Sequence, residues 1–224
     1  MPLFSANIST LFCELPALDR ITAARKAGFR AVEIQFPYEI PLEQWLEKKR
    51  RTKMRVVLIN VPAGDLTSGG PGLAAIPGRE AEFRAAVRDC AVYAKALSVN
   101  VVNVLAGAPA PDMDRARCME CFVENLHHAA GVMGGIGVRV VTEPINCRAQ
   151  PNFLISTTAE ALQAIDWAGH ENLALQYDVY HAQIMEGDLI QTLEANLARI
   201  GHIQFADVPD RHEPGTGEIH FSNL

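Results

Sequence analysis

The chain has 224 residues, 49% hydrophobic and 21% charged, and is long enough to bury a sizeable core. Its formal net charge of −6 argues against a general nucleic-acid or membrane-surface binder. Five cysteines, an odd number in a chain too long to need disulfide staples, favour a reducing compartment, and no apolar run approaches transmembrane length. We therefore expect a cytoplasmic protein with neither a nucleic-acid nor a membrane partner.

Short apolar runs alternate with helical patterns from the start of the chain. The strands predicted in the first half cover residues 5–8, 31–36, 54–61 and 100–105. The helices predicted there cover residues 15–28 and 42–53, followed by one that opens at Gly78. Residues 63–78 are rich in Gly, Ser and Pro, which predicts a loop long enough to need a functional explanation.

The same alternation continues through the second half of the chain. Three further strands are predicted within residues 137–146, 173–181 and 202–211. The helices predicted in this half cover residues 115–133, 157–167 and 188–200, each ahead of one of these strands. Thr157 and Glu160 have the spacing of a capping box, which places the start of the second of these helices.

Seven strand-then-helix alternations, the last incomplete, run through residues 1–224 without a break in composition. This pattern predicts one domain with a parallel sheet and right-handed crossovers. An open doubly wound sheet and a TIM (β/α)₈ barrel both fit. No GxGxxG motif follows the first strand, and polar residues at several strand ends suit the barrel better. We expect an α/β TIM barrel that lacks the eighth strand and final helix, because the sequence stops at Leu224.

Side chains with oxygen donors stand where three of the predicted strands end: Glu143, Asp178 and Gln204. Because function gathers at the carboxyl ends of parallel strands, we expect these residues to form one site. His181 and Arg211 are candidate donors to an anionic substrate. Each residue also has a structural alternative. Glu143 can cap a helix or pair with an arginine, and Asp178 can belong to a turn. His181 can be a core histidine, and Arg211 can lie in a surface turn.

Two carboxylates and an amide form a set of hard oxygen ligands, which suits Mg²⁺ or Mn²⁺ better than zinc. Such an ion can hold the two adjacent oxygens of a hydroxy-carbonyl compound and stabilise an enediolate. A neighbouring carboxylate can then move a proton between the two carbons. The residues therefore indicate aldose–ketose isomerase chemistry.

Seven stretches spread over nearly the whole chain resemble one known family. They are FSANIST, AVEIQFPY, LINVPAGD, PGRE, VTEPIN, LQYDVYHAQIMEGDL and HIQFADVPDRHEPGTGEI. Together they resemble the hydroxypyruvate isomerase family of the xylose-isomerase-like barrel superfamily. The resemblance implies interconversion of hydroxypyruvate and 2-hydroxy-3-oxopropanoate (tartronate semialdehyde) through a metal-stabilised enediolate, in glyoxylate metabolism.

The resemblance also implies roles for individual residues. Glu143 matches the family's first catalytic glutamate, which is also a metal ligand, and Asp178 and Gln204 match two further ligands. The implied cofactor is a divalent metal, Mg²⁺ with Mn²⁺ as the alternative. The family's second catalytic glutamate lies in an eighth strand, which is missing from this chain.

Other functions fit the same sequence. A 2-oxo-tetronate isomerase is a close alternative, because related proteins with similar motifs use that longer acid. A sugar epimerase of the same superfamily fits less well, since a histidine usually stands there in place of Gln204. From another class comes a non-catalytic, shortened form that acts through association with a partner or as a homo-oligomer. The expected partner of the enzyme is a small anionic hydroxy-keto acid.

Overall fold

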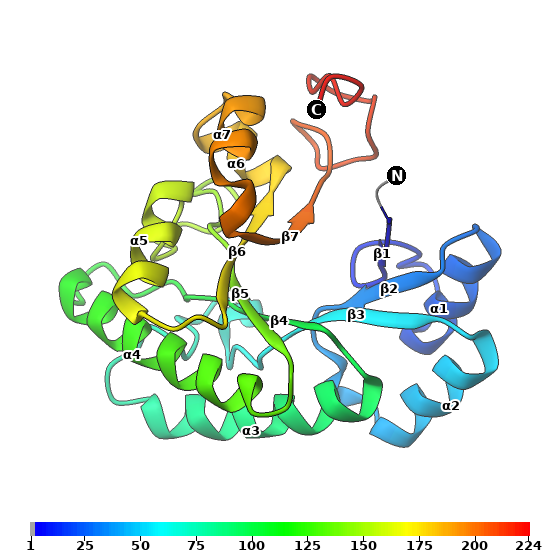
Figure 1. The fold of residues 1–224 in the computed structure, drawn as a ribbon, viewed down its shortest axis with the longest axis horizontal. Helices are drawn as coiled ribbons and strands as arrows, with labels where there is room; N and C mark the ends of the chain where they lie inside the picture. The colour runs from blue at the N-terminus through cyan, green and yellow to red at the C-terminus, as the bar shows by residue number, and fades with distance from the viewer. Residues whose placement is uncertain (1–2) are drawn as a thin grey trace.

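The computed structural model describes residues 3–224 as a curled parallel sheet covered on its outer side by helices (Figure 1). The strands are β1 (Ala6–Asn7), β2 (Ala31–Ile34), β3 (Arg55–Asn60), β4 (Val101–Val104), β5 (Arg139–Thr142), β6 (Leu173–Asp178) and β7 (Ile200–Gln204). The α-helices are α1 (Ala17–Lys26), α2 (Leu42–Thr52), α3 (Glu80–Leu97), α4 (Arg115–Gly134), α5 (Thr158–Ala168), α6 (Val179–Met185) and α7 (Leu189–Asn196). Short 3₁₀ turns cover Pro37–Glu39, Leu66–Ser68 and Leu197–Arg199.

The seven strands form one sheet in the order β1 to β7, and every neighbouring pair is parallel. Sequential order with helical crossovers is the topology of a TIM barrel. Within residues 3–224, β1 and β7 are not paired, so the sheet curls into a barrel with one open side. Figure 1 shows β1 and the loop that follows β7 at this side. The predicted fold class is confirmed.

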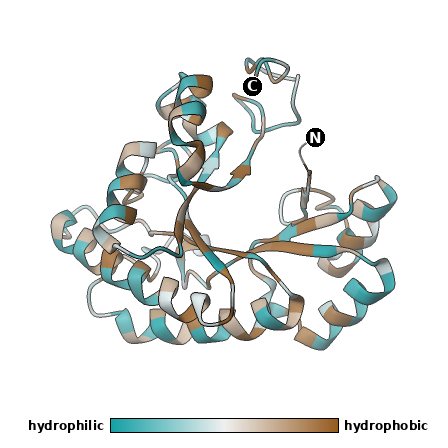
Figure 2. Cartoon of the chain, viewed as in Figure 1, coloured by the Kyte–Doolittle hydropathy of each residue, from teal (hydrophilic) through white to brown (hydrophobic). Residues whose placement is uncertain are grey.

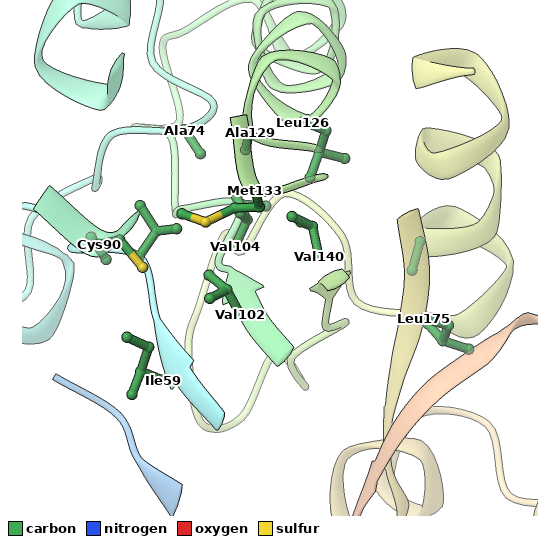
Figure 3. Close-up of a cluster of buried hydrophobic side chains, with 14 of the residues drawn as sticks. Ile59, Ala74, Cys90, Val102, Val104, Leu126, Ala129, Met133, Val140 and Leu175 are labelled. Carbon is green, nitrogen blue, oxygen red and sulfur yellow. The ribbon is translucent and has the colours of Figure 1, made fainter. Parts of the chain in front are cut away.

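Alternation along the strands separates the outer core from the barrel interior. Val102 and Val104 of β4 and Val140 of β5 are fully buried and lie on the side of α4, near Met133 (Figure 3). The residue between the two β4 valines, Asn103, therefore points into the barrel. In Figure 2 the strands are mainly apolar, and the helices that surround the sheet have largely hydrophilic outer faces.

A bulge near the start of β7 turns its polar residues inward. Leu175 pairs with Ile200 and Gln176 pairs with His202, which leaves Gly201 as an extra residue. A Cβ on Gly201 would lie 2.8 Å from the Ala174 Cβ and 2.9 Å from a Val141 methyl, so no side chain fits there. After the bulge, His202 and Gln204 share the face of Gln176 and Asp178.

The boundaries in the second half of the chain agree only in part with the sequence predictions. The predicted strand end at Asp178 is confirmed, and His181 lies on α6, a helix that was not predicted. The helix predicted over residues 188–200 ends as α7 at Asn196, and Ile200 already belongs to β7. The capping box of Thr157 and Glu160 is confirmed at the start of α5. None of the described helices is long and apolar enough to cross a membrane.

Candidate active site

Three buried side chains meet where β5 and β6 end. Glu143 directly follows β5, Asp178 is the last residue of β6, and His181 lies in α6, which begins immediately afterwards. Each is at most 6% exposed, and one ligand atom from each lies within 4.8 Å of the others. The structure thus brings together three of the five predicted site residues in one buried cluster.

The two carboxylate oxygens of Glu143 have different surroundings. Oε2 accepts hydrogen bonds from Asn103 Nδ2 at 2.9 Å and Gln176 Nε2 at 2.7 Å. Oε1 lies 3.8 Å from His181 Nε2, beyond hydrogen-bonding distance. Burial and the negative charge of Asp178 raise the pKa of Glu143 above its usual value. One oxygen is therefore held by amide donors, while the other faces the cluster.

Asp178 links the cluster to the loop after β7. Its Oδ1 accepts from the backbone N–H of Tyr180, which caps the start of α6. Its Oδ2 accepts from the Arg211 guanidinium at 2.9 Å, and that guanidinium lies 4.9 Å from the centre of the Tyr180 ring. Arg211 thus lies at the cluster, paired with Asp178.

Gln204 belongs to a hydrogen-bonded chain of polar side chains inside the barrel. Its Oε1 accepts from Gln176 Nε2 at 2.9 Å, and the same Nε2 donates to Glu143. Its Nε2 donates to Glu33 Oε2 at 2.6 Å. Glu33 Oε1 also accepts from Ser5 Oγ at 2.7 Å and lies 2.8 Å from His202 Nε2. Burial acts to raise the pKa of Glu33, but these donors outweigh it and hold the pKa below its usual value.

A small cavity opens beside the cluster. Its volume is about 160 Å³, and Glu143, His181 and Arg211 contribute to its polar wall. Phe36 and Phe153 contribute to its apolar wall, and Leu66 reaches it from the long loop predicted over residues 63–78. This volume is below the roughly 300–1,000 Å³ typical of drug-sized ligands, so the cavity suits a small molecule.

The residues around Glu143 fit a divalent cation. Glu143 and Asp178 are both buried, and burial together with the charge of Asp178 raises the pKa of Glu143 although Arg211 opposes it. The amide oxygens Asn103 Oδ1 and Gln176 Oε1 are buried nearby and find no hydrogen-bond partner among the residues that the structure describes. A hard cation takes oxygen ligands of this kind. The cluster can therefore hold a metal ion.

Comparison with known proteins places this geometry in a family. The family model of the xylose isomerase-like TIM barrel matches residues 21–224. A 2-oxo-tetronate isomerase of Cupriavidus necator is 41% identical over all of this chain and 86% of its own length. The chain belongs to the xylose isomerase-like TIM barrel family.

Two further comparisons give another named isomerase and a solved structure with the same fold. The hydroxypyruvate isomerase of Escherichia coli is 42% identical over 99% of this chain and 86% of its own length. A crystal structure described as an AP endonuclease, family 2, from Brucella melitensis superimposes with a TM-score of 0.96 at 40% identity, covering all of this chain and 86% of that one. The 2-oxo-tetronate isomerase and the hydroxypyruvate isomerase are both isomerases, and their similarity over the whole chain identifies this protein as an isomerase.

Several site residues of this family member were not predicted from the sequence. Glu33, Asn103 and Gln176 each interrupt an apolar strand and point into the barrel, and Asn146 contacts His181. A single polar residue at an inward position of a buried strand is the signal that could have found the first three.

Proposed function

We propose that this isomerase interconverts hydroxypyruvate and 2-hydroxy-3-oxopropanoate. The observation that carries the proposal is the environment of Glu143. Its carboxylate is buried on the wall of a small cavity, with Oε2 fixed by two amides and Oε1 free to exchange a proton. A raised pKa brings a carboxylate nearer the range in which it can both take up and release a proton at neutral pH.

Proton transfer between adjacent carbons is the central chemical step. Glu143 Oε1 is the proposed base that removes a proton from C3 of hydroxypyruvate, leaving an enediolate. Return of a proton at C2, together with transfer of the C3 hydroxyl proton to the C2 oxygen, completes the isomerisation without any change in overall composition. The amides of Asn103 and Gln176 keep Oε2 in place, so that the reacting oxygen has a fixed direction.

A divalent cation, Mg²⁺ or Mn²⁺, is the proposed cofactor, with Glu143, Asp178 and Gln204 as its ligands. Bound there, it would stabilise the negative charge that develops on the substrate oxygens. Support for Gln204 comes from its hydrogen bond to Gln176, which links its carbonyl oxygen to the amide that also holds Glu143.

Arg211 and His181 are the proposed donors to the anionic substrate. Arg211 carries five N–H donors, and its hydrogen bond to Asp178 comes from Nη2, which leaves further donors for a substrate carboxylate. Burial and the nearby Arg211 lower the pKa of His181 to about 4, against the opposing influence of Asp178. His181 is therefore neutral at pH 7 and can donate only a single N–H.

A 2-oxo-tetronate is the second candidate substrate, because a 41% identical relative carries that name. Steady-state rates with the two acids, measured at the same Mg²⁺ concentration, distinguish them. We expect a higher kcat/KM for hydroxypyruvate, since the cavity is small. A higher value for the 2-oxo-tetronate would reassign the substrate while leaving the enzyme class unchanged.

A further inference from the structure

Asn146 holds the imidazole of His181 at Nδ1. The backbone N–H of Asn146 donates to Nδ1 at 3.3 Å, and Asn146 Nδ2 lies 2.7 Å from the same nitrogen. Both residues are buried, with His181 at 3% and Asn146 at 0% exposure. A backbone N–H can only donate, so Nδ1 has to present its lone pair.

The side chain of Asn146 is itself fixed in orientation. Its Oδ1 accepts a 2.7 Å hydrogen bond from the backbone N–H of Ala149. Rotating the amide by half a turn would place an NH₂ group against that N–H and lose the bond. Asn146 Nδ2 therefore faces His181 as a second donor, and the only ring proton of a neutral His181 lies on Nε2.

The Nε2 proton points into the cluster of acidic residues. Nε2 lies 3.6 Å from Asp178 Oδ2 and 3.8 Å from Glu143 Oε1, and both distances are too long for a hydrogen bond. Because His181 also lines the cavity, this N–H is available to a molecule bound there.

We infer that Asn146 is a positioning residue that keeps His181 as an Nε2–H donor to a substrate oxygen and prevents it from acting as a metal ligand. The inference rests on the proposed function. Metal ligation through Nε2 requires a lone pair on that nitrogen and hence a proton on Nδ1. That proton would point at two N–H donors of Asn146. The cation is then left to the oxygen ligands, which Mg²⁺ prefers.

The test is ¹H–¹⁵N NMR of the full chain labelled at histidine nitrogens, with His181→Asn used to assign the signals. In the wild type we expect a protonated Nε2 and an unprotonated Nδ1 at His181, unchanged when Mg²⁺ is added. In Asn146→Asp, a carboxylate oxygen replaces Nδ2 at 2.7 Å from Nδ1, while the backbone N–H stays at 3.3 Å. The closer, charged acceptor outweighs the longer backbone contact, so we expect a proton to appear on Nδ1. Turnover of hydroxypyruvate should fall by about 10–100-fold in this variant.

The matched control is Asn125→Asp, which places the same substitution at a buried asparagine of α4 that donates to the Ala74 carbonyl. It should leave the His181 signals unchanged. A wild-type His181 protonated on Nδ1, or loss of the Nε2 proton on addition of Mg²⁺, would overturn the inference even if Asn146→Asp does not fold. A wild type with the expected protonation but no turnover of hydroxypyruvate would instead contradict the proposed function and, with it, the catalytic role of His181.

Discussion

Glu33 on β2 accepts a 2.6 Å hydrogen bond from the side-chain amide of Gln204 on β7, two strands that share no ladder. The bond crosses the open side of the barrel. It also sets the orientation of the Gln204 amide, because a carboxylate accepts from NH₂ and repels a carbonyl oxygen. Gln204 Oε1 is thereby directed towards Gln176 and the cluster around Glu143.

Removal of the Glu33 carboxylate should destabilise the fold strongly. Glu33→Ala leaves the Gln204 amide, the Ser5 hydroxyl and His202 without their common acceptor in a buried site. We expect the free energy of unfolding to fall by about 3–5 kcal/mol, the range for breaking a buried polar pair. Urea unfolding followed by circular dichroism measures it.

Glu47→Ala is the matched control for this substitution. Glu47 forms an exposed ion pair with Arg51 one turn along α2. Its removal should change the free energy of unfolding by no more than about 0.5 kcal/mol. Equal losses in the two variants would show that the Glu33 network adds no particular stability across the open side.

The bulge at Gly201 leads to a prediction about packing. In Gly201→Ala, the new methyl group would meet Ala174 and Val141 at distances below 3.0 Å, so neighbouring strands have to shift. We expect a loss of about 1–3 kcal/mol in the free energy of unfolding.

Gly131→Ala is the comparison variant, for which we expect the free energy of unfolding to rise. Its Cβ would come no closer than 3.8 Å to His170, and Gly131 lies within α4. This change should stabilise the protein by about 0.5–1 kcal/mol, because alanine favours the helix. If the Gly201 variant were as stable as wild type, the bulge would be looser than the structure indicates.

Asp207 organises the loop that carries Arg211. Its carboxylate accepts four backbone N–H bonds at 2.9–3.0 Å, from Val208, Gly215, Gly217 and Ile219. Burial alone would raise the pKa of Asp207, but these four donors hold it below the usual value of 3.8. A lowered pKa means that the carboxylate contributes stability above about pH 4, which is lost as the pH falls through the folded-state pKa.

Asp207→Asn should therefore be less stable than wild type at neutral pH, because one amide N–H₂ group faces backbone donors. The difference should shrink as both proteins are taken from about pH 6 to pH 3, because the unfolded wild type takes up a proton below about pH 4 while the folded carboxylate resists it. Thermal unfolding over this range measures it. A difference that stays constant with pH would show that the ionised form of Asp207 has no special role.

The sequence predicts the strand order and three of the strand-end residues well, because each depends on local pattern. An apolar run that ends in Glu143 or Asp178 can be recognised without knowing its neighbours. Helix α6 was not predicted, for a related reason. The segment after Asp178 is compatible with strand or helix, and Asp178 decides it in the fold by capping the helix.

A lone polar residue in an apolar strand marks Glu33 and Asn103 as candidates, but the contacts that these residues make could not be predicted from local patterns. Glu33 and Gln204 are 171 positions apart, and Asn103 and Glu143 are 40 apart, so no local spacing links them. Their contacts depend on the curl of the sheet and on the bulge at Gly201, which sets the inward face of β7. Neither feature has a signature in hydrophobic periodicity.

Proton NMR of hydroxypyruvate in D₂O with Mg²⁺ tests the role of Glu143 most directly. The measurement follows deuterium incorporation at C3 and the appearance of the aldehyde, with Glu143→Gln as the control, since glutamine keeps the shape and removes the base. We expect the wild type to exchange C3 protons at least about 100-fold faster than the variant, as for removal of a general base. Equal exchange rates in the two proteins would contradict the assignment of Glu143 as the base.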